Sequence, residues 1–213
     1  SDPEPFRGGP HLASPPNFSD LPYTMQPLTH FLQNEFGVSP SMTAEIARYY
    51  QLEQLNKDDF LIKKGQAARK SCFIKDGYLR FFSYSEKKSI THWIFGKGQL
   101  ATDISGFYLQ QPAKWNIQAL TDTTVYTLTY SNYQKLQTRF PEWERHEKLM
   151  IVKLMAGLEN RVYALASMTA EERYQYLFQR DSNMFNELPL QYLASMLGMT
   201  PETLSRIRKK AQG

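Results

Sequence analysis

Cysteine is almost absent from this sequence, in which Cys72 is the single example among 213 residues. Disulfide frameworks and iron–sulfur clusters each need several cysteines, so both are excluded. Long apolar runs are missing too, because the best candidate, residues 149–158, contains Lys153 and falls short of the roughly 18 residues that span a bilayer. The N-terminal residues also lack the apolar core of a secretory signal. We therefore expect a soluble, cytoplasmic protein that does not enter a membrane.

Catalytic signatures are equally scarce. Of the four histidines only His92 falls in the β-rich region, whereas a metal enzyme on a cupin-like barrel gathers several histidine and carboxylate ligands. The sequence has no nucleophile elbow, phosphate-binding loop or dinucleotide-binding glycine fingerprint. A haem could take His92 or Cys72 as an axial ligand, but a lone histidine is more often a packed residue. We expect no catalytic activity and no metal or haem cofactor.

The N-terminal part of the chain divides into a leader and packing helices. Six of the twelve prolines lie in the first 22 residues, which indicates a flexible leader over residues 1–24. Apolar residues at helical spacing then predict one helix over 28–36, which ends at Gly37, and a second short helix over 43–52.

Residues 55–128 have a β texture, with short aromatic and β-branched runs separated by turn signals. The expected strands are Cys72–Ile74, Tyr78–Tyr84, Ile90–Phe95, Ile117–Leu120 and Val125–Leu128. Strands at this spacing are typical of an antiparallel barrel, sandwich or jelly roll. The predicted fold class is therefore α+β, with an antiparallel β jelly-roll or barrel domain and its N-terminal helices over residues 25–140.

A long helix is predicted over residues 141–168, and it has two apolar stripes. One consists of Ile151, Leu154, Leu158, Val162, Leu165 and Met168, and the other of Leu149, Val152, Ala156, Tyr163 and Ala166. Two stripes predict two packing partners, the chain's own β-domain and another helix. The simplest second partner is the same helix of a twin subunit, which predicts a homodimer, while the alternative is a helix buried within a monomer.

The last segment, residues 169–213, is predicted to be a helical module that begins with a capping box at Thr169 and Glu172. Within it, residues 190–210 meet the demands of a helix-turn-helix, which needs a small residue where two helices touch and a glycine at the turn. Ala194 and Gly198 supply these two residues. The shared apolar core is expected to consist of Leu193, Leu197, Met199, Leu204 and Ile207.

The second helix of this motif is predicted to read DNA. Thr200 is a good N-cap and Pro201 suits the first helical position. The outward face would carry Pro201, Glu202, Ser205, Arg206 and Lys209, and the flank that engages phosphates would carry Arg208, Lys209 and Lys210. Residues 200–213 hold a net charge of +3 out of +4 for the whole chain, as expected for a nucleic-acid contact, although a solvated terminal helix has the same composition.

The order of β-barrel, long helix and helix-turn-helix, with Thr200–Ile207 in the second helix, resembles the Crp/Fnr family of bacterial transcription regulators. Further marks of this resemblance are Leu61–Gly65, Phe73–Arg80 and Gly98–Leu100. It implies a homodimer with a jelly-roll sensor domain and a winged-helix-like DNA-binding domain that reads a near-palindrome in double-stranded DNA and contacts RNA polymerase. Glu202 and Arg206 match base-contacting positions of the family, while Pro201 replaces a frequent arginine.

The resemblance also implies an effector pocket, for which the candidate residues are Gly98, Gln99, Leu100, Lys114 and Trp115. A cyclic nucleotide would need a glutamate for the ribose and an arginine with a serine or threonine for the phosphate. Gln99 stands where the glutamate is expected, and residues 110–115 lack the arginine, although Lys114 could supply a charge. Cyclic AMP is therefore not expected, and the effector stays open. The alternative function is a ligand-binding or protein-interaction module of the same fold without DNA binding.

Overall fold

The computed structural model describes residues 25–86 and 88–212, so the predicted leader lies outside the described residues. Helices α1 (Gln26–Phe36) and α2 (Pro40–Ala47) come first, and Gly37, with φ of 63°, ends α1 as expected. The predicted extent of the second helix, to residue 52, was wrong. The chain enters strand β1 (Tyr50–Leu55), which pairs with a distant strand. Local spacing could not reveal this partner.

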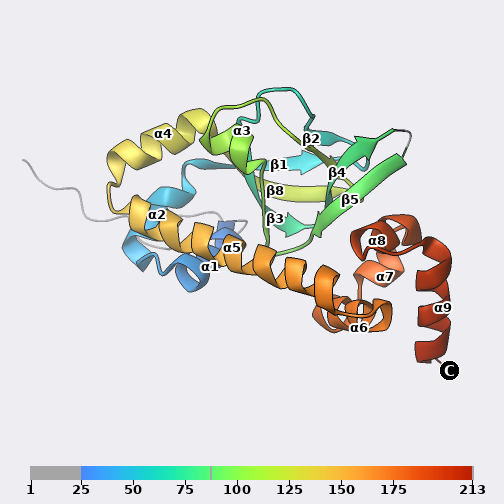
Figure 1. Ribbon diagram of the computed structural model, residues 1–213. Helices are drawn as coiled ribbons and strands as arrows, with labels where there is room; N and C mark the ends of the chain where they lie inside the picture. Colours follow the sequence, from blue (N-terminus) through green and yellow to red (C-terminus); the bar gives the residue numbers. More distant parts are fainter. Residues whose placement is uncertain (1–24, 87, 213) are drawn as a thin grey trace, which may run out of the picture.

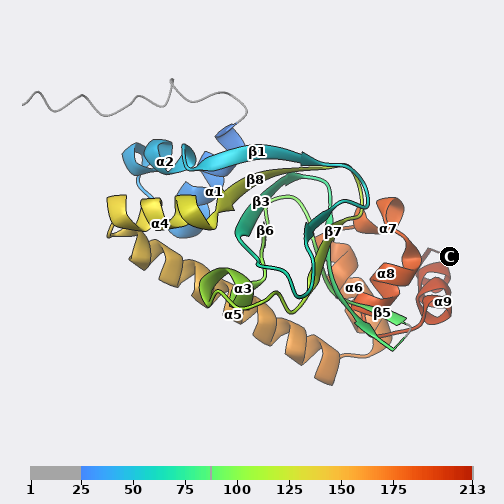
Figure 2. The same ribbon diagram turned by 90° about the horizontal axis from the view of Figure 1, so that it is seen from above.

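The β-domain consists of two four-stranded antiparallel sheets (Figures 1 and 2). The first sheet has the order β1 (Tyr50–Leu55), β8 (Thr123–Thr129), β3 (Lys70–Asp76) and β6 (Leu100–Ala101). The second has the order β2 (Phe60–Ile62), β7 (Asn116–Ala119), β4 (Leu79–Ser85) and β5 (Lys88–Phe95). All five expected strands are confirmed, while β1, β2 and β6 were not predicted.

Apolar side chains from both sheets form one buried cluster between them, which includes Cys72, Ile74, Leu79, Ile117 and Val125. Helix α3 (Ile104–Tyr108) connects β6 to β7, and helix α4 (Tyr130–Arg139) follows β8, the last strand. The sheets lie between α1, α2 and α4 on one side and the C-terminal helices on the other (Figure 2). The α+β jelly-roll prediction is confirmed.

The long helix α5 (Trp143–Ser167) runs beside the β-domain towards the C-terminal helices (Figure 1). The prediction that one of its two apolar stripes packs on the β-domain was wrong, because both stripes are mostly exposed. A third row faces the rest of the chain instead, at successive spacings of four, three, four, seven and three residues: Trp143, Glu147, Met150, Leu154, Arg161 and Ala164. The apolar pattern did not reveal this row because the row includes the charged residues Glu147 and Arg161.

The C-terminal module consists of α6 (Ala170–Arg180), α7 (Met184–Glu187), α8 (Leu190–Met196) and α9 (Pro201–Gln212). The predicted capping box of Thr169 and Glu172 is present at the start of α6. Between residues 169 and 212 the module contains helices and no strand, so the described residues lack the wing that a winged-helix-like domain implies. No helix in the described part of the chain is long and apolar enough to cross a membrane.

Candidate nucleic-acid interface

Helices α8 and α9 meet across a tight turn in the manner expected of a helix-turn-helix. Ala194 is completely buried at their contact, and the amide of Met199 donates to its carbonyl oxygen at 3.0 Å. Gly198 has φ of 67°, and a Cβ at this position would lie 3.2 Å from Cδ2 of Leu165 on α5. The turn thus needs glycine for its backbone angle and has little room for a side chain.

The predicted apolar core of the motif is confirmed, since Leu193, Leu197, Leu204 and Ile207 belong to one buried cluster and Met199 packs against it. Thr200 caps α9, because its Oγ1 accepts a hydrogen bond from the amide of Thr203 at 3.2 Å. A hydrogen bond from its own backbone amide, with a second from the Thr200 hydroxyl, lowers the pKa of Glu202. The carboxylate is therefore ionised at the positive end of the helix.

Arginines from two other helices hold the C-terminal end of α8. The guanidinium of Arg161 on α5 donates to the carbonyl oxygen of Met196 at 2.9 Å, and that of Arg173 on α6 donates to the carbonyl oxygen of Leu197 at 2.7 Å. Cations are favourable at this negative end, where the last carbonyl groups lack helical partners. The position of α8 relative to α5 is therefore fixed by polar contacts as well as by packing.

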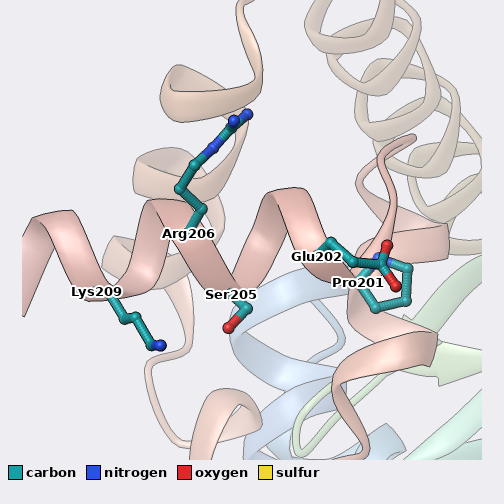
Figure 3. A pocket seen from close by; sticks show the side chains of 5 residues that line it. All are labelled: Pro201, Glu202, Ser205, Arg206 and Lys209. Atoms are coloured by element: carbon teal, nitrogen blue, oxygen red, sulfur yellow. The ribbon is translucent and has the colours of Figure 1, made fainter.

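The outward side of α9 forms a shallow hollow lined by Pro201, Glu202, Ser205, Arg206 and Lys209. Figure 3 shows these five side chains on α9, with Arg206 and Lys209 extending in different directions. We call these five residues the reading face. Among the described residues, neither Arg206 nor Lys209 is in an ion pair, so both cations are available to a partner.

The remaining cations of α9 are already engaged. The guanidinium of Arg208 lies 5.8 Å from the ring centroid of Phe185 on α7, and Nζ of Lys210 lies 3.7 Å from a carboxylate oxygen of Glu171 on α6. Arg208 is half-buried and lies outside the reading face. It stays a predicted phosphate contact only if its side chain turns away from Phe185.

A heptad-spaced row of exposed apolar residues runs along α5. It consists of Ile151, Met155, Leu158, Val162 and Leu165, separated by four, three, four and three residues. Each of the five is between 43% and 59% exposed in the single chain. Leu154, expected in this row, is instead half-buried against α1 and its neighbours, and Met155, which belongs to neither predicted stripe, takes its place. We call this row the α5 seam.

The expected effector-pocket residues are engaged in separate contacts. Gly98, with Lys75 and Lys97, lines a hollow between α1 and β3. The side-chain oxygen of Gln99 accepts from the amide of Gly96 at 3.2 Å, and Leu100 pairs with Phe73 in the first sheet. Lys114 and Trp115 lie at a different point, the turn that follows α3.

At that turn a side-chain carboxylate of the protein itself, that of Asp103, accepts hydrogen bonds from the backbone amides. The amides of Gly106, Lys114 and Trp115 donate to the carboxylate of Asp103 at 2.7, 2.8 and 3.2 Å, and Asp103 is 1% exposed. A Cβ on Gly106 would lie 2.5 Å from that of Ala68, so only glycine fits there. The donors that could have received a phosphate are bound to an internal carboxylate, and the Lys114 side chain is exposed. These residues do not fit a cyclic nucleotide.

The two candidate haem ligands are held by their own neighbours. Nε2 of His92 lies 2.8 Å from Oγ of Ser83, and its ring packs 4.5 Å from that of Trp115. Burial, assisted by Arg161 and Arg80, lowers the pKa of His92. Sγ of Cys72 lies 3.3 Å from Oγ1 of Thr127, and burial raises the pKa of this thiol to about 12. Cys72 is thus a protonated core residue.

The comparisons with known proteins agree with this architecture. Residues 52–139 match the family of cyclic nucleotide-binding domains. FixK2 from Bradyrhizobium japonicum is similar with a TM-score of 0.64, at 19% identity over 76% of this chain and 84% of that one. A mutant of CooA from Carboxydothermus hydrogenoformans gives a TM-score of 0.59, at 19% identity over 79% and 78% of the two chains. The catabolite activator protein of Thermus thermophilus gives 0.52, at 18% identity over 84% and 85%.

No curated protein sequence matches the chain significantly. At identities below 20%, the three solved structures establish a shared fold. Residues 52–139 are therefore similar to cyclic nucleotide-binding domains, and the chain shares the fold of these three solved structures.

Proposed function

We propose that this protein is a bacterial DNA-binding transcription regulator of the Crp/Fnr type. The observation that carries the proposal is the reading face, which presents two unpaired cations and an ionised carboxylate on the second helix of a helix-turn-helix. Such a helix fits the major groove of double-stranded DNA. The guanidinium of Arg206 would make a bidentate contact to guanine, and the carboxylate of Glu202 would accept from cytosine N4. Lys209 would contact a phosphate.

The working form would be a homodimer that pairs through the α5 seam. A seam with alternating spacings of three and four residues is the pattern of helices that pack in parallel along their length. Because five such residues are exposed in a single chain, we expect another apolar surface to cover them. A second copy of the same helix presents the complementary surface. Twofold symmetry would place two reading faces on half-sites about one helical turn apart.

The effector, if the regulator uses one, would not be a cyclic nucleotide, because Asp103 occupies the donors at the turn after α3. On promoter DNA in the cytoplasm, the dimer would contact RNA polymerase. The proposal includes no catalytic activity.

The experiment that tests this function is selection from a random pool of double-stranded DNA by the purified protein at about 0.15 M salt, where weak non-specific binding is suppressed. Enrichment of a twofold symmetric site is the expected result. Enrichment of a single, unrepeated half-site would support DNA reading but contradict the dimer. No enrichment, combined with unchanged binding of bulk DNA by Arg206→Ala, would favour a ligand-binding or protein-interaction module.

A further inference from the structure

One edge of the second sheet, formed by β5, is covered by the C-terminal helical module. Strand β5 is the outermost strand of this sheet, and an uncovered edge strand would present unpaired backbone groups. The amide of Thr91 on β5 donates instead to Oγ of Ser195 on α8, at 3.0 Å. Figure 1 shows α8 beside β5, and α9 on the far side of α8. The β-domain and the module therefore meet through α8.

Apolar packing joins the two parts as well. Tyr78, Ile94 and Leu120 of the β-domain belong to the same buried cluster as Leu193 and Ala194 of α8. This cluster also contains the core of the helix-turn-helix. A movement of α8 away from β5 would thus expose apolar surface that both parts share.

Arg80 on β4 lies at the centre of this contact. Its guanidinium carbon is 4.2 Å from the ring centroid of Phe82 on β4 and 3.9 Å from that of Tyr192 on α8. Its Nε donates to Oγ1 of Thr91 at 2.8 Å, and its Nη2 donates to Oγ of Ser89 at 2.9 Å. The side chain therefore connects two strands of the sheet to the first helix of the DNA-binding motif.

The surroundings of this cation are unusual, because Arg80 is only 3% exposed. Among the residues that the structure describes, no carboxylate lies within ion-pair distance of it. Two aromatic faces and two hydroxyl groups satisfy the charge instead. A planar guanidinium can stack on rings while its edge donates hydrogen bonds, which neither an ammonium nor an apolar side chain reproduces.

We propose that Arg80 is a positioning residue for DNA reading, which fixes α8 on β5 and thereby sets the direction of the reading face. The inference rests on the proposed function. Because α8 and α9 share one core, the position of α8 determines that of α9. A dimer reads two half-sites at a set spacing, so each module must be held at a defined angle to its own β-domain and α5. The contact leaves the reading face exposed, so DNA can reach this face while α8 is docked on β5.

The test compares Arg80→Met with the matched control Lys63→Met. Lys63 also lies over an aromatic ring, with Nζ 4.9 Å from the centroid of Phe60. Unlike Arg80, it is exposed. It directly follows β2, which lies at the opposite edge of the sheet from β5. Both variants remove one positive charge from the second sheet or its neighbourhood. Tyr192→Leu provides a second variant that removes a ring on the α8 side and leaves the β-domain intact.

Binding to the selected DNA site is measured by fluorescence anisotropy, the dimer by light scattering, and the amide of Thr91 by hydrogen exchange. We expect Arg80→Met and Tyr192→Leu to weaken DNA binding at least about tenfold, with an intact dimer and faster exchange at Thr91. Lys63→Met should match the wild type in all three measurements.

Equal or tighter DNA binding by Arg80→Met, with an intact dimer, would overturn the positioning role. Unchanged hydrogen exchange at the Thr91 amide would overturn the claim that Arg80 holds α8 on β5, whatever the effect on DNA binding. If Arg80→Met does not fold, the same readings are taken from Tyr192→Leu. A wild-type protein that binds no DNA would refute the proposed function and the reading role together, whereas the exchange measurement would still decide whether Arg80 holds α8.

Discussion

The carboxylate of Glu147 on α5 accepts a hydrogen bond from the hydroxyl of Tyr133 on α4, at 3.1 Å, in a site where Glu147 is only 8% exposed. Gln137 in turn donates to the Tyr133 hydroxyl at 2.6 Å. The long helix is thus tied to α4, which follows the last strand of the β-domain, by a buried polar contact.

Burial raises the pKa of Glu147 above its ordinary value of 4.5, although hydrogen bonds from Tyr133, Tyr108 and Gln137 act in the other direction. Because the folded state then binds the proton more tightly than the unfolded state, this group stabilises the fold at low pH. We expect its contribution to be lost as the pH rises above 4.5 and through the folded pKa. Glu147→Gln should remove this dependence, as measured by urea unfolding between pH 4 and 8. A parallel pH profile for the variant and the wild type would contradict the prediction.

The α5 seam predicts that Leu158→Asp separates the proposed dimer, because the substitution places a carboxylate in an apolar contact. An unpaired buried charge costs several kcal/mol, so the dissociation constant should rise at least about 100-fold. Asn160→Asp is the matched control, since Asn160 is an exposed residue of the same helix outside the seam. Sedimentation velocity over a concentration series measures both. A dimer that tolerates Leu158→Asp would exclude pairing through this face.

The reading face predicts a sequence-dependent loss for Arg206→Ala. A bidentate contact to guanine discriminates between bases by about 1–3 kcal/mol, so affinity for the selected site should fall by this amount and base choice should relax at one position of each half-site. Repeating the DNA selection with the variant measures this directly. An equal loss on all sequences would make Arg206 a phosphate contact.

Lys209→Ala is expected to weaken binding to every DNA sequence by a similar factor. A phosphate contact releases counterions, so the slope of log affinity against log salt should decrease by roughly one unit. Titrations at several salt concentrations give this slope, and Lys210→Ala serves as comparison because Lys210 is paired with Glu171. An unchanged slope for Lys209→Ala would remove this residue from the interface.

The buried carboxylate of Asp103 predicts a large loss of stability for Asp103→Ala. Three backbone amides would lose their acceptor. Since hydrogen bonds to a charged group contribute about 1.5–3 kcal/mol each, we expect a loss of about 3 kcal/mol or more. Thermal unfolding measures the loss, and wild-type protein with millimolar cyclic AMP provides the companion test, in which no rise in melting temperature is expected. A clear rise would show that the nucleotide displaces this carboxylate.

Local sequence alone determined the elements that depend on nearby residues. The capping box at Thr169, the turn at Gly198 and the outward position of Arg206 follow from spacings of three or four residues, and the structure has the first two as predicted. The five expected strands were likewise visible as aromatic and β-branched runs between turns. These features are fixed by hydrogen bonds and backbone angles within a short stretch of chain.

Only the tertiary structure decided which faces are buried and which polar groups meet. Contacts of α5 with the rest of the chain half-bury Leu154 and leave Met155 in the seam, whereas the apolar pattern placed Leu154 in the stripe and left Met155 out. The carboxylate of Asp103 accepts hydrogen bonds from amides that lie 11 and 12 residues further along the chain. The guanidinium of Arg80 on β4 stacks on the ring of Tyr192 on α8, which lies far away in the sequence. Such contacts depend on how separate elements are brought together, because a buried charge selects its partners by proximity in the folded state and not by spacing in the sequence.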